Sequence, residues 1–189
     1  MNKLRIVSIV SAFCFALVFL SCSKGYHGKV YEGYAYFQSA QVVTANGIVL
    51  PPSTGGGAAQ SSYDAGTHIL NYTITWTGLS GPPIAIHIHG LGDIAELALP
   101  APLGPYGIDS FKVSSTTYIK YAGGIAQKIT VPSGSTNSGS ISGSLFADNV
   151  VIKENDLLHG KYYFDIHTAT NPLYITFGEV RAQISLSEK

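Results

Sequence analysis

Charged residues are scarce in this chain of 189 residues: they make up 12%, with 11 basic and 11 acidic side chains. Because the two signs balance, the chain lacks the basic surface that nucleic-acid binding requires. Little Glu and Lys, with 21 glycines and 12 tyrosines, disfavours a helical bundle and favours strands joined by turns. Hydrophobic residues still make up 46%, which is enough for a folded core and unlike a disordered chain.

Cysteine is also nearly absent, with only Cys14 and Cys22 in the whole chain. Cys14 lies in the apolar run of residues 6–20, which follows a short basic start. This run is shorter than the ~20 residues of a membrane span and matches a secretory signal peptide. Its end, Leu20-Ser21-Cys22, resembles a bacterial lipobox, and this resemblance implies cleavage before Cys22 and attachment of a lipid such as palmitate to it.

These features predict a signal peptide over residues 1–21, a lipidated tether over 22–32 and one folded domain over 33–187. We expect the mature chain in the bacterial cell envelope, attached to a membrane by the lipid on Cys22. The domain itself contains no cysteine, which excludes disulfides, thiol catalysis and thiolate metal ligation within it. Its hydrophobic core must therefore hold it together alone.

Apolar and polar residues alternate along several short segments that Gly- and Pro-rich turns separate, as is typical of half-buried strands. The clearest segments are residues 70–76, 84–88, 162–167 and 180–186. Residues 45–59 have the composition of a loop, and residues 153–160 predict a single helical turn that Gly160 ends. The fold class predicted is all-β, an antiparallel Greek-key β-sandwich or barrel.

The alternation also predicts which side chains share a face, because successive side chains of a strand point to opposite sides. If Ile84, Ile86 and Ile88 point into the core, then His87 and His89 point away from it. Imidazoles two residues apart on a strand have Cβ atoms ~7 Å apart. Both rings can then reach one metal ion at about 2.0–2.1 Å.

The same phase applies to two later strands. Asp165 and His167 are expected to point outward from the first, and Glu179 and Arg181 from the second. His167 would complete a site of three nitrogen ligands that suits copper or zinc. Asp165 could act as a fourth ligand or as a hydrogen-bond acceptor behind a ligand. Asp165, Glu179 and Arg181 are the other candidates for a binding face.

A hydrogen-bonded polar network without a metal accounts for the same residues. Outward strand faces commonly carry polar side chains, and Glu179 and Arg181 could form structural ion pairs there. His159 is expected near the end of the short helix, where the helix dipole favours a positive charge. The residues alone leave the metal site and the polar network as open alternatives.

Two segments taken together resemble a chordin-type (CHRD) domain. The first reads LNYTITWTGLSG over residues 70–81, followed by AIHIHG over 85–90, and the second reads DLLHGKYYFDIHT over 156–168, followed by GEVRAQI over 178–184. The resemblance implies an immunoglobulin-like β-barrel of a kind found in secreted proteins, and it implies no particular activity. Asp165 stands where such domains usually have Asn, and residues 173–177 lengthen a turn that is usually tight.

The run from Ile86 to Asp93 is also similar to the copper-ligand strand of copper–zinc superoxide dismutases. We expect a lipid-anchored CHRD module that acts in binding or adhesion, with a protein or small ligand as partner. A histidine cluster could give this module a copper or zinc ion. The alternative function is a dismutase-like metalloenzyme, although the domain lacks the cysteine pair of that family.

Overall fold

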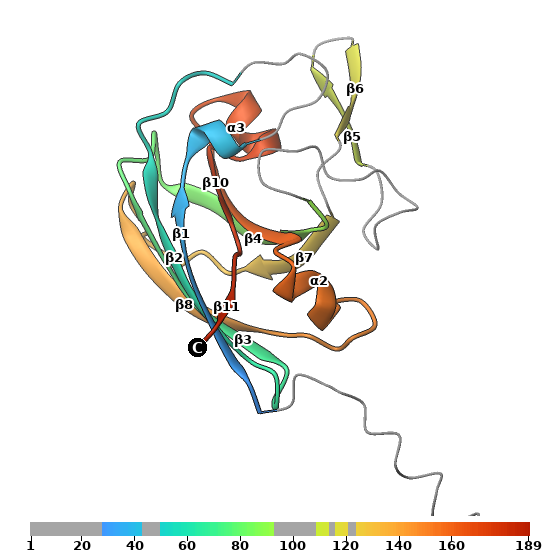
Figure 1. Cartoon of the computed structure of the whole chain (residues 1–189). Coiled ribbons are helices and arrows are strands. Elements are labelled where there is room, and N and C mark those ends of the chain that lie inside the picture. Colours follow the sequence, from blue (N-terminus) through green and yellow to red (C-terminus); the bar gives the residue numbers. More distant parts are fainter. Residues whose placement is uncertain (1–27, 43–49, 93–108, 114–115, 121–123) are drawn as a thin grey trace, which may run out of the picture.

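The computed structural model describes residues 28–42, 50–92, 109–113, 116–120 and 124–189. Within these ranges the chain forms a five-stranded sheet and a four-stranded sheet, and a separate two-stranded hairpin (Figure 1). Every strand pair is antiparallel. The predicted all-β sandwich is therefore confirmed.

The five-stranded sheet has the order β11-β1-β2-β3-β8. Its strands are β11 (Ser187–Glu188), β1 (Val30–Phe37), β2 (Gly56–Asp64), β3 (Ile69–Thr77) and β8 (Gly139–Phe146). β1 begins at Val30. The loop expected over residues 45–59 is wrong from Gly56 onward, because this Gly-, Ala- and Ser-rich segment pairs along both of its edges, with β1 and with β3.

The four-stranded sheet has the order β10-β9-β4-β7. Its strands are β10 (Val180–Gln183), β9 (Tyr162–Thr168), β4 (Pro83–Gly90) and β7 (Gly124–Ile129), and the hairpin consists of β5 (Asp109–Val113) and β6 (Thr116–Lys120). All seven residues of β9 are buried, in agreement with its place inside the sheet. This strand and β4 carry the residues of the predicted metal site.

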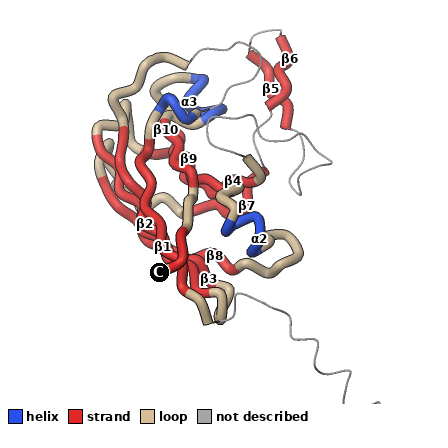
Figure 2. The backbone as a smooth tube through the Cα atoms, viewed as in Figure 1, coloured by secondary structure: helices blue, strands red, loops and turns tan. Residues whose placement is uncertain are grey.

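In the part of the chain that the structure describes, two short helices and one 3-10 turn accompany the sheets (Figure 2). They are α2 (Glu154–Leu158), α3 (Pro172–Phe177) and η1 (Ser39–Gln41). α2 confirms the helical turn predicted before Gly160, which has a φ of 67°. The lengthened turn expected over residues 173–177 is instead α3. None of the helices in the described ranges is both long and apolar enough to span a membrane.

The hydrophobic core lies between the two sheets. The ring centroid of Phe164 from β9 lies 5.3 Å from that of Tyr72 in β3 and 6.4 Å from that of Phe37 in β1. Ile86 and Ile88 of β4 are fully buried against them. These contacts fix which face of the four-stranded sheet points inward, and the other face is left for the polar side chains.

Ile84 does not follow this phase. Its predicted burial is wrong, because the side chain is 49% exposed. The register between β4 and β9 shifts between Pro83 and Ala85, where Thr168 and His167 are the successive partners on β9. The extra residue forms a β-bulge, which changes the direction of its side chain. The alternation of β4 therefore holds only after the bulge.

Edges of the two sheets approach each other on both sides of the sandwich. On one side, backbone hydrogen bonds of 3.0 and 3.2 Å join Gln38, just after β1, to Arg181 of β10. On the other side, the Gln127 amide of β7 donates to the Ser144 carbonyl of β8 at 2.8 Å. The Gln127 side-chain oxygen also accepts from the Tyr72 hydroxyl at 3.1 Å. The sandwich is thus partly closed into a barrel.

A fully buried carboxylate, Glu179, lies just before β10. Its two oxygens accept hydrogen bonds from the Ser53 hydroxyl, the Ser80 amide and hydroxyl, and the Thr168 hydroxyl, at 2.5–2.8 Å. Burial raises the pKa of Glu179, but these hydrogen bonds outweigh burial and leave the pKa below its ordinary value of 4.5. The carboxylate therefore joins three distant segments in its ionised form.

We expect Glu179→Gln to lower the free energy of unfolding at pH 7 by about 2 kcal/mol, because hydrogen bonds to a charged group are lost. A depressed native pKa gives stability that is present above pH 4.5 and is lost as the pH falls further. The difference between wild type and variant should then narrow in acid, as measured by urea unfolding between pH 7 and pH 3. Glu188→Gln, at an exposed Lys29 ion pair, is the control and should change little. A difference that stays constant with pH contradicts this role.

Candidate metal centre

The outward face of the four-stranded sheet brings three imidazoles around one carboxylate. In the antiparallel register of β4 and β9, His87 lies directly opposite Asp165. His89 follows His87 on β4, and His167 follows Asp165 on β9, so these two residues flank the central pair on opposite sides. The four side chains predicted from strand phase therefore meet, although they come from segments about 80 residues apart.

The ligand atoms of these four residues all lie within 4.8 Å of one another. His89 Nε2 is 3.4 Å from His87 Nδ1 and 3.2 Å from Asp165 Oδ2. His167 Nε2 is 3.1 Å from the same Asp165 oxygen. A tetrahedral ion with bonds of about 2.0–2.1 Å needs ligand atoms about 3.3–3.4 Å apart. Three of the six separations, at 3.1–3.4 Å, are close to the edge of such a tetrahedron, and the others lie within 4.8 Å. We call this group the His/Asp cluster.

The His/Asp cluster is largely closed to solvent. The side chains of His89, Asp165 and His167 are 3–5% exposed, whereas that of His87 is 14% exposed. Burial raises the pKa of the Asp165 carboxyl, but the charges and hydrogen bonds of His167 and His89 outweigh burial and hold the pKa well below its usual range. The cluster therefore contains a buried carboxylate ion, with His87 as its most accessible member.

One oxygen of this carboxylate has no hydrogen bond. Asp165 Oδ1 is fully buried and accepts no hydrogen bond from the residues that the structure describes. His87 Nδ1 lies 3.6 Å from this oxygen, which is beyond hydrogen-bond distance. A buried carboxylate oxygen normally has a partner. A cation within the cluster would provide one.

The orientation of His167 is fixed by α3. His167 Nδ1 lies 3.1 Å from the Tyr174 carbonyl and 2.9 Å from the Ile175 carbonyl. Because carbonyl oxygens only accept hydrogen bonds, Nδ1 must carry the proton. Nε2 then points toward Asp165, either as a second N–H of an imidazolium or as a lone pair for a metal. The alternation of residues along a strand does not predict these contacts between His167 and α3.

The sequence does contain a signal for α3. The Asn171 side chain accepts a hydrogen bond from the Leu173 amide at 2.9 Å, and Pro172 occupies the first turn. Asn before Pro is a typical start of a helix. The expectation of a lengthened turn over residues 173–177 left this helix start unrecognised. The backbone carbonyls that accept from His167 were therefore not predicted either.

Arg181 lies on the same sheet face but outside the His/Asp cluster. The Arg181 guanidinium lies 3.6 Å from the centroid of the Tyr163 ring and donates to the Gln183 side chain at 2.7 Å. Tyr163 stacks on His89 with centroids 5.4 Å apart and planes at 10°. Arg181 thus holds the Tyr163 ring, which in turn packs on His89.

Glu179 precedes β10, and its carboxylate accepts from Thr168, whose side chain has the inward phase of Phe164 and Ile166. Its side chain therefore does not share the outward face, where we expected it. Glu179 belongs to the separate network of hydroxyl groups described above.

Other candidates lie away from the cluster or outside the described ranges. His68 contacts the Tyr63 hydroxyl at 3.2 Å and Glu154 at 3.7 Å. His159 caps α2 as expected, with Nδ1 2.7 Å from the Asn155 carbonyl. The predicted lipid site, Cys22, falls among residues that the structure does not describe. Within the described ranges, the His/Asp cluster is the one group of at least three metal-ligating side chains.

Comparison with known proteins gives one match. The family model of the CHRD domain matches residues 38–184, which is most of the chain. No curated protein and no solved structure matches the chain. The match covers the whole four-stranded sheet and β2, β3 and β8 of the other sheet, and it includes all four residues of the His/Asp cluster. The chain belongs to the CHRD domain family.

Proposed function

We propose that this CHRD domain is a metal-binding module of the cell envelope, which holds one zinc or copper ion in the His/Asp cluster. The observation that supports this proposal best is the mutual spacing of the four ligand atoms, all within 4.8 Å. Three imidazoles and one carboxylate are ordinary ligands of both metals. The Asp165 oxygen without a hydrogen bond would gain a partner when the ion binds.

The ligand types suit both zinc and copper. Three separations of 3.1–3.4 Å are close to the edge of a tetrahedral zinc shell, and the full set, within 4.8 Å, also accommodates the tetragonal arrangement that Cu²⁺ prefers. Four protein ligands fill a tetrahedral shell and leave no position for a substrate. The proposed role is therefore to hold an ion as part of a binding or adhesion module, without turnover.

A dismutase-like enzyme is the alternative considered from the sequence, and the geometry gives it less support. That resemblance implies two neighbouring metal sites that share a bridging histidine. The four side chains of the described cluster together supply the ligands of a single ion. The proposal is accordingly limited to one ion with a closed set of ligands.

The location in the envelope is a separate part of the proposal. A basic start, an apolar run over residues 6–20 and Ser21-Cys22 directly after it support export and lipidation. The described fold begins at residue 28, so a short segment would connect Cys22 to β1. The lipid on Cys22 would then hold the metal-binding domain next to a membrane.

We expect the untagged wild-type chain to bind one equivalent of Zn²⁺, and His89→Ala and Asp165→Asn to bind it at least about tenfold more weakly. Loss of an imidazole nitrogen, or of the only carboxylate of the cluster, removes a bond to the ion that the remaining groups cannot replace. Metal content by mass spectrometry and Zn²⁺ titration by calorimetry measure this effect.

His159→Ala is the matched control, because this histidine is exposed and outside the cluster. Zn²⁺ at about 100 times its Kd should stabilise the wild type by about 2.7 kcal/mol in thermal unfolding, and a chelator should reverse this. Equal Zn²⁺ uptake by wild type, His89→Ala and Asp165→Asn would overturn the metal-site proposal. Folded proteins that bind no Zn²⁺ or Cu²⁺ would support the polar network instead.

For the anchor, we expect cells that express the wild-type chain to incorporate labelled palmitate into it and to retain it in the membrane fraction. Cys22→Ser should abolish the label, because the thiol is the attachment point that the lipobox resemblance implies. Cys14→Ser is the matched control and should still be labelled. Label on the Cys22→Ser variant would show that the lipid is attached elsewhere.

A further inference from the structure

The outer face of the five-stranded sheet carries an ordered set of uncharged side chains. The strand registers place Tyr34, Gln60, Thr73 and Ser142 in one row across β1, β2, β3 and β8. Tyr36 and Asn71 lie in the adjoining rows. Because neighbouring strands are about 4.8 Å apart, the side chains of such a row follow one another at intervals of about 4.8 Å. We call these six residues the polar face.

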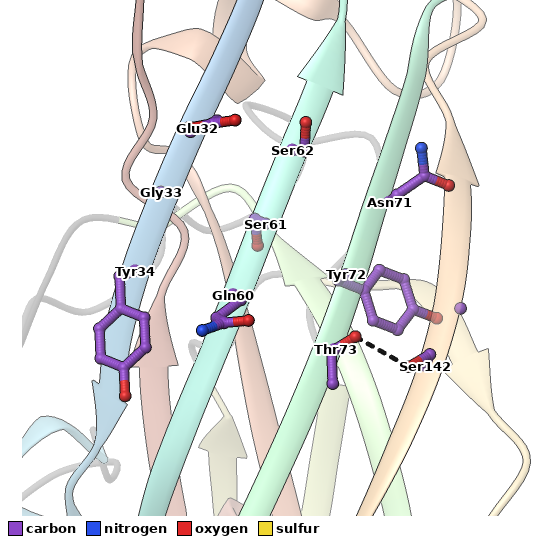
Figure 3. A pocket seen from close by; sticks show the side chains of 11 residues that line it. Glu32, Gly33, Tyr34, Gln60, Ser61, Ser62, Asn71, Tyr72, Thr73 and Ser142 are labelled. Carbon is purple, nitrogen blue, oxygen red and sulfur yellow. Dashed lines mark hydrogen bonds between the residues drawn. The ribbon is translucent and has the colours of Figure 1, made fainter. Parts of the chain in front are cut away.

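The polar face is hollowed, as the close view shows (Figure 3). A shallow cavity of about 690 Å³ lies over the middle of the sheet, with Tyr34 at one end and Ser142 at the other. Its floor is formed by paired backbone, so its shape is set by the sheet and not by mobile side chains. The hollow is an open depression large enough for a small ligand.

Tyr34, in the lining of this hollow, and its neighbour Tyr36 both project toward solvent. The side chains of Tyr34 and Tyr36 are 52% and 62% exposed. Their ring centroids lie 5.0 Å apart with planes at 76°. Neighbouring exposed aromatic rings provide flat apolar surfaces with a polar tip, an arrangement common where a protein binds a ligand.

The remaining lining groups are hydrogen-bonding but uncharged. Gln60, Ser62 and Asn71 have no side-chain hydrogen bond to the described residues, so donors and acceptors are available to a ligand. Thr73 and Ser142 share one hydrogen bond of 2.8 Å and keep further capacity. The one acid of the lining, Glu32, is paired with Lys189 Nζ at 2.7 Å.

We propose that the polar face binds an uncharged polysaccharide chain. A sugar ring presents an apolar C–H surface that can stack on Tyr34 or Tyr36, and its hydroxyls both donate and accept, as do the amides and hydroxyls beside them. A neutral ligand suits this face, because Glu32, the only charged side chain in the lining of the hollow, is already paired with Lys189. A polynucleotide would need Lys or Arg in the hollow, and a protein interface would need an apolar centre.

This site gives the proposed binding module a ligand class, but it uses different residues from the metal site. The His/Asp cluster lies on the outward face of the other sheet, and the hydrophobic core separates the two. Loss of metal binding therefore leaves the polysaccharide proposal intact, and the reverse also holds. The two sites can be tested separately in one set of variants.

The test measures retardation of the detergent-solubilised full chain in native gels that contain a soluble neutral polysaccharide: a β-glucan, xylan, mannan or dextran. Dissociation constants follow from calorimetry with oligosaccharides of the polymer that retards it. We expect retardation by at least one of them, and about tenfold weaker binding for Tyr34→Ala and Tyr36→Ala, as for aromatic residues central to an interface. Thr73→Ala should weaken binding less. Alginate, a polyanion, should not retard the chain.

Phe146→Ala is the matched control, since this aromatic ring is 59% exposed and lies at the far corner of the same sheet face. It should leave binding unchanged, as should His89→Ala. If Tyr34→Ala does not fold, as judged by circular dichroism, Gln60→Ala takes its place. Retardation by none of the four polymers overturns the proposal. Equal loss in Phe146→Ala and Tyr34→Ala also overturns it, because binding would then reflect exposed aromatic surface in general.

Discussion

The antiparallel register between β4 and β9 is the constraint on which the account of this protein depends. It sets His87 against Asp165 and buries Ile86 and Ile88 on the opposite face. Because side chains alternate, a slip of one residue would send the imidazoles into the core and the isoleucines outward. Burial of the core residues and assembly of the His/Asp cluster are therefore two results of one register, and the hydrophobic effect that fixes the first also positions the second.

The two sheets use their outward faces in different ways. On the four-stranded sheet the outward side chains of β9 and β10 are buried, and Asp165 is ionised there, as is the buried Glu179 just before β10. A buried charge is costly unless it is paired or hydrogen-bonded. Hydroxyl and amide donors form hydrogen bonds with both oxygens of Glu179, whereas one oxygen of Asp165 accepts no hydrogen bond from the described residues, although imidazoles surround it. The two buried carboxylates therefore differ, because only Glu179 has both of its oxygens hydrogen-bonded to segments of the described fold. The five-stranded sheet instead exposes an uncharged face with two tyrosines.

Strand periodicity predicted the fold class, the core phase of β9 and β10, and the grouping of His87, His89 and His167, since these depend only on alternation along a strand. It failed at Ile84, where a bulge depends on the partner strand, and over β2, whose small and polar residues have low strand propensity and are stabilised by pairing on both edges. It also could not show that Arg181 lies over Tyr163 or that carbonyls of α3 hold His167, because both contacts depend on how segments pack. The capping residues of α3 were present in the sequence and could have been recognised.

X-ray absorption at the zinc edge of the Zn²⁺-loaded full chain tests the central claim most directly. The account predicts four light-atom ligands at about 2.0–2.1 Å, with multiple scattering from three imidazoles. In Asp165→Asn the oxygen contribution should change while the imidazole scattering remains. A spectrum with five or six oxygen ligands, or with fewer than two imidazoles, would contradict the account, because the ion would then lie outside the group that the register of β4 and β9 assembles.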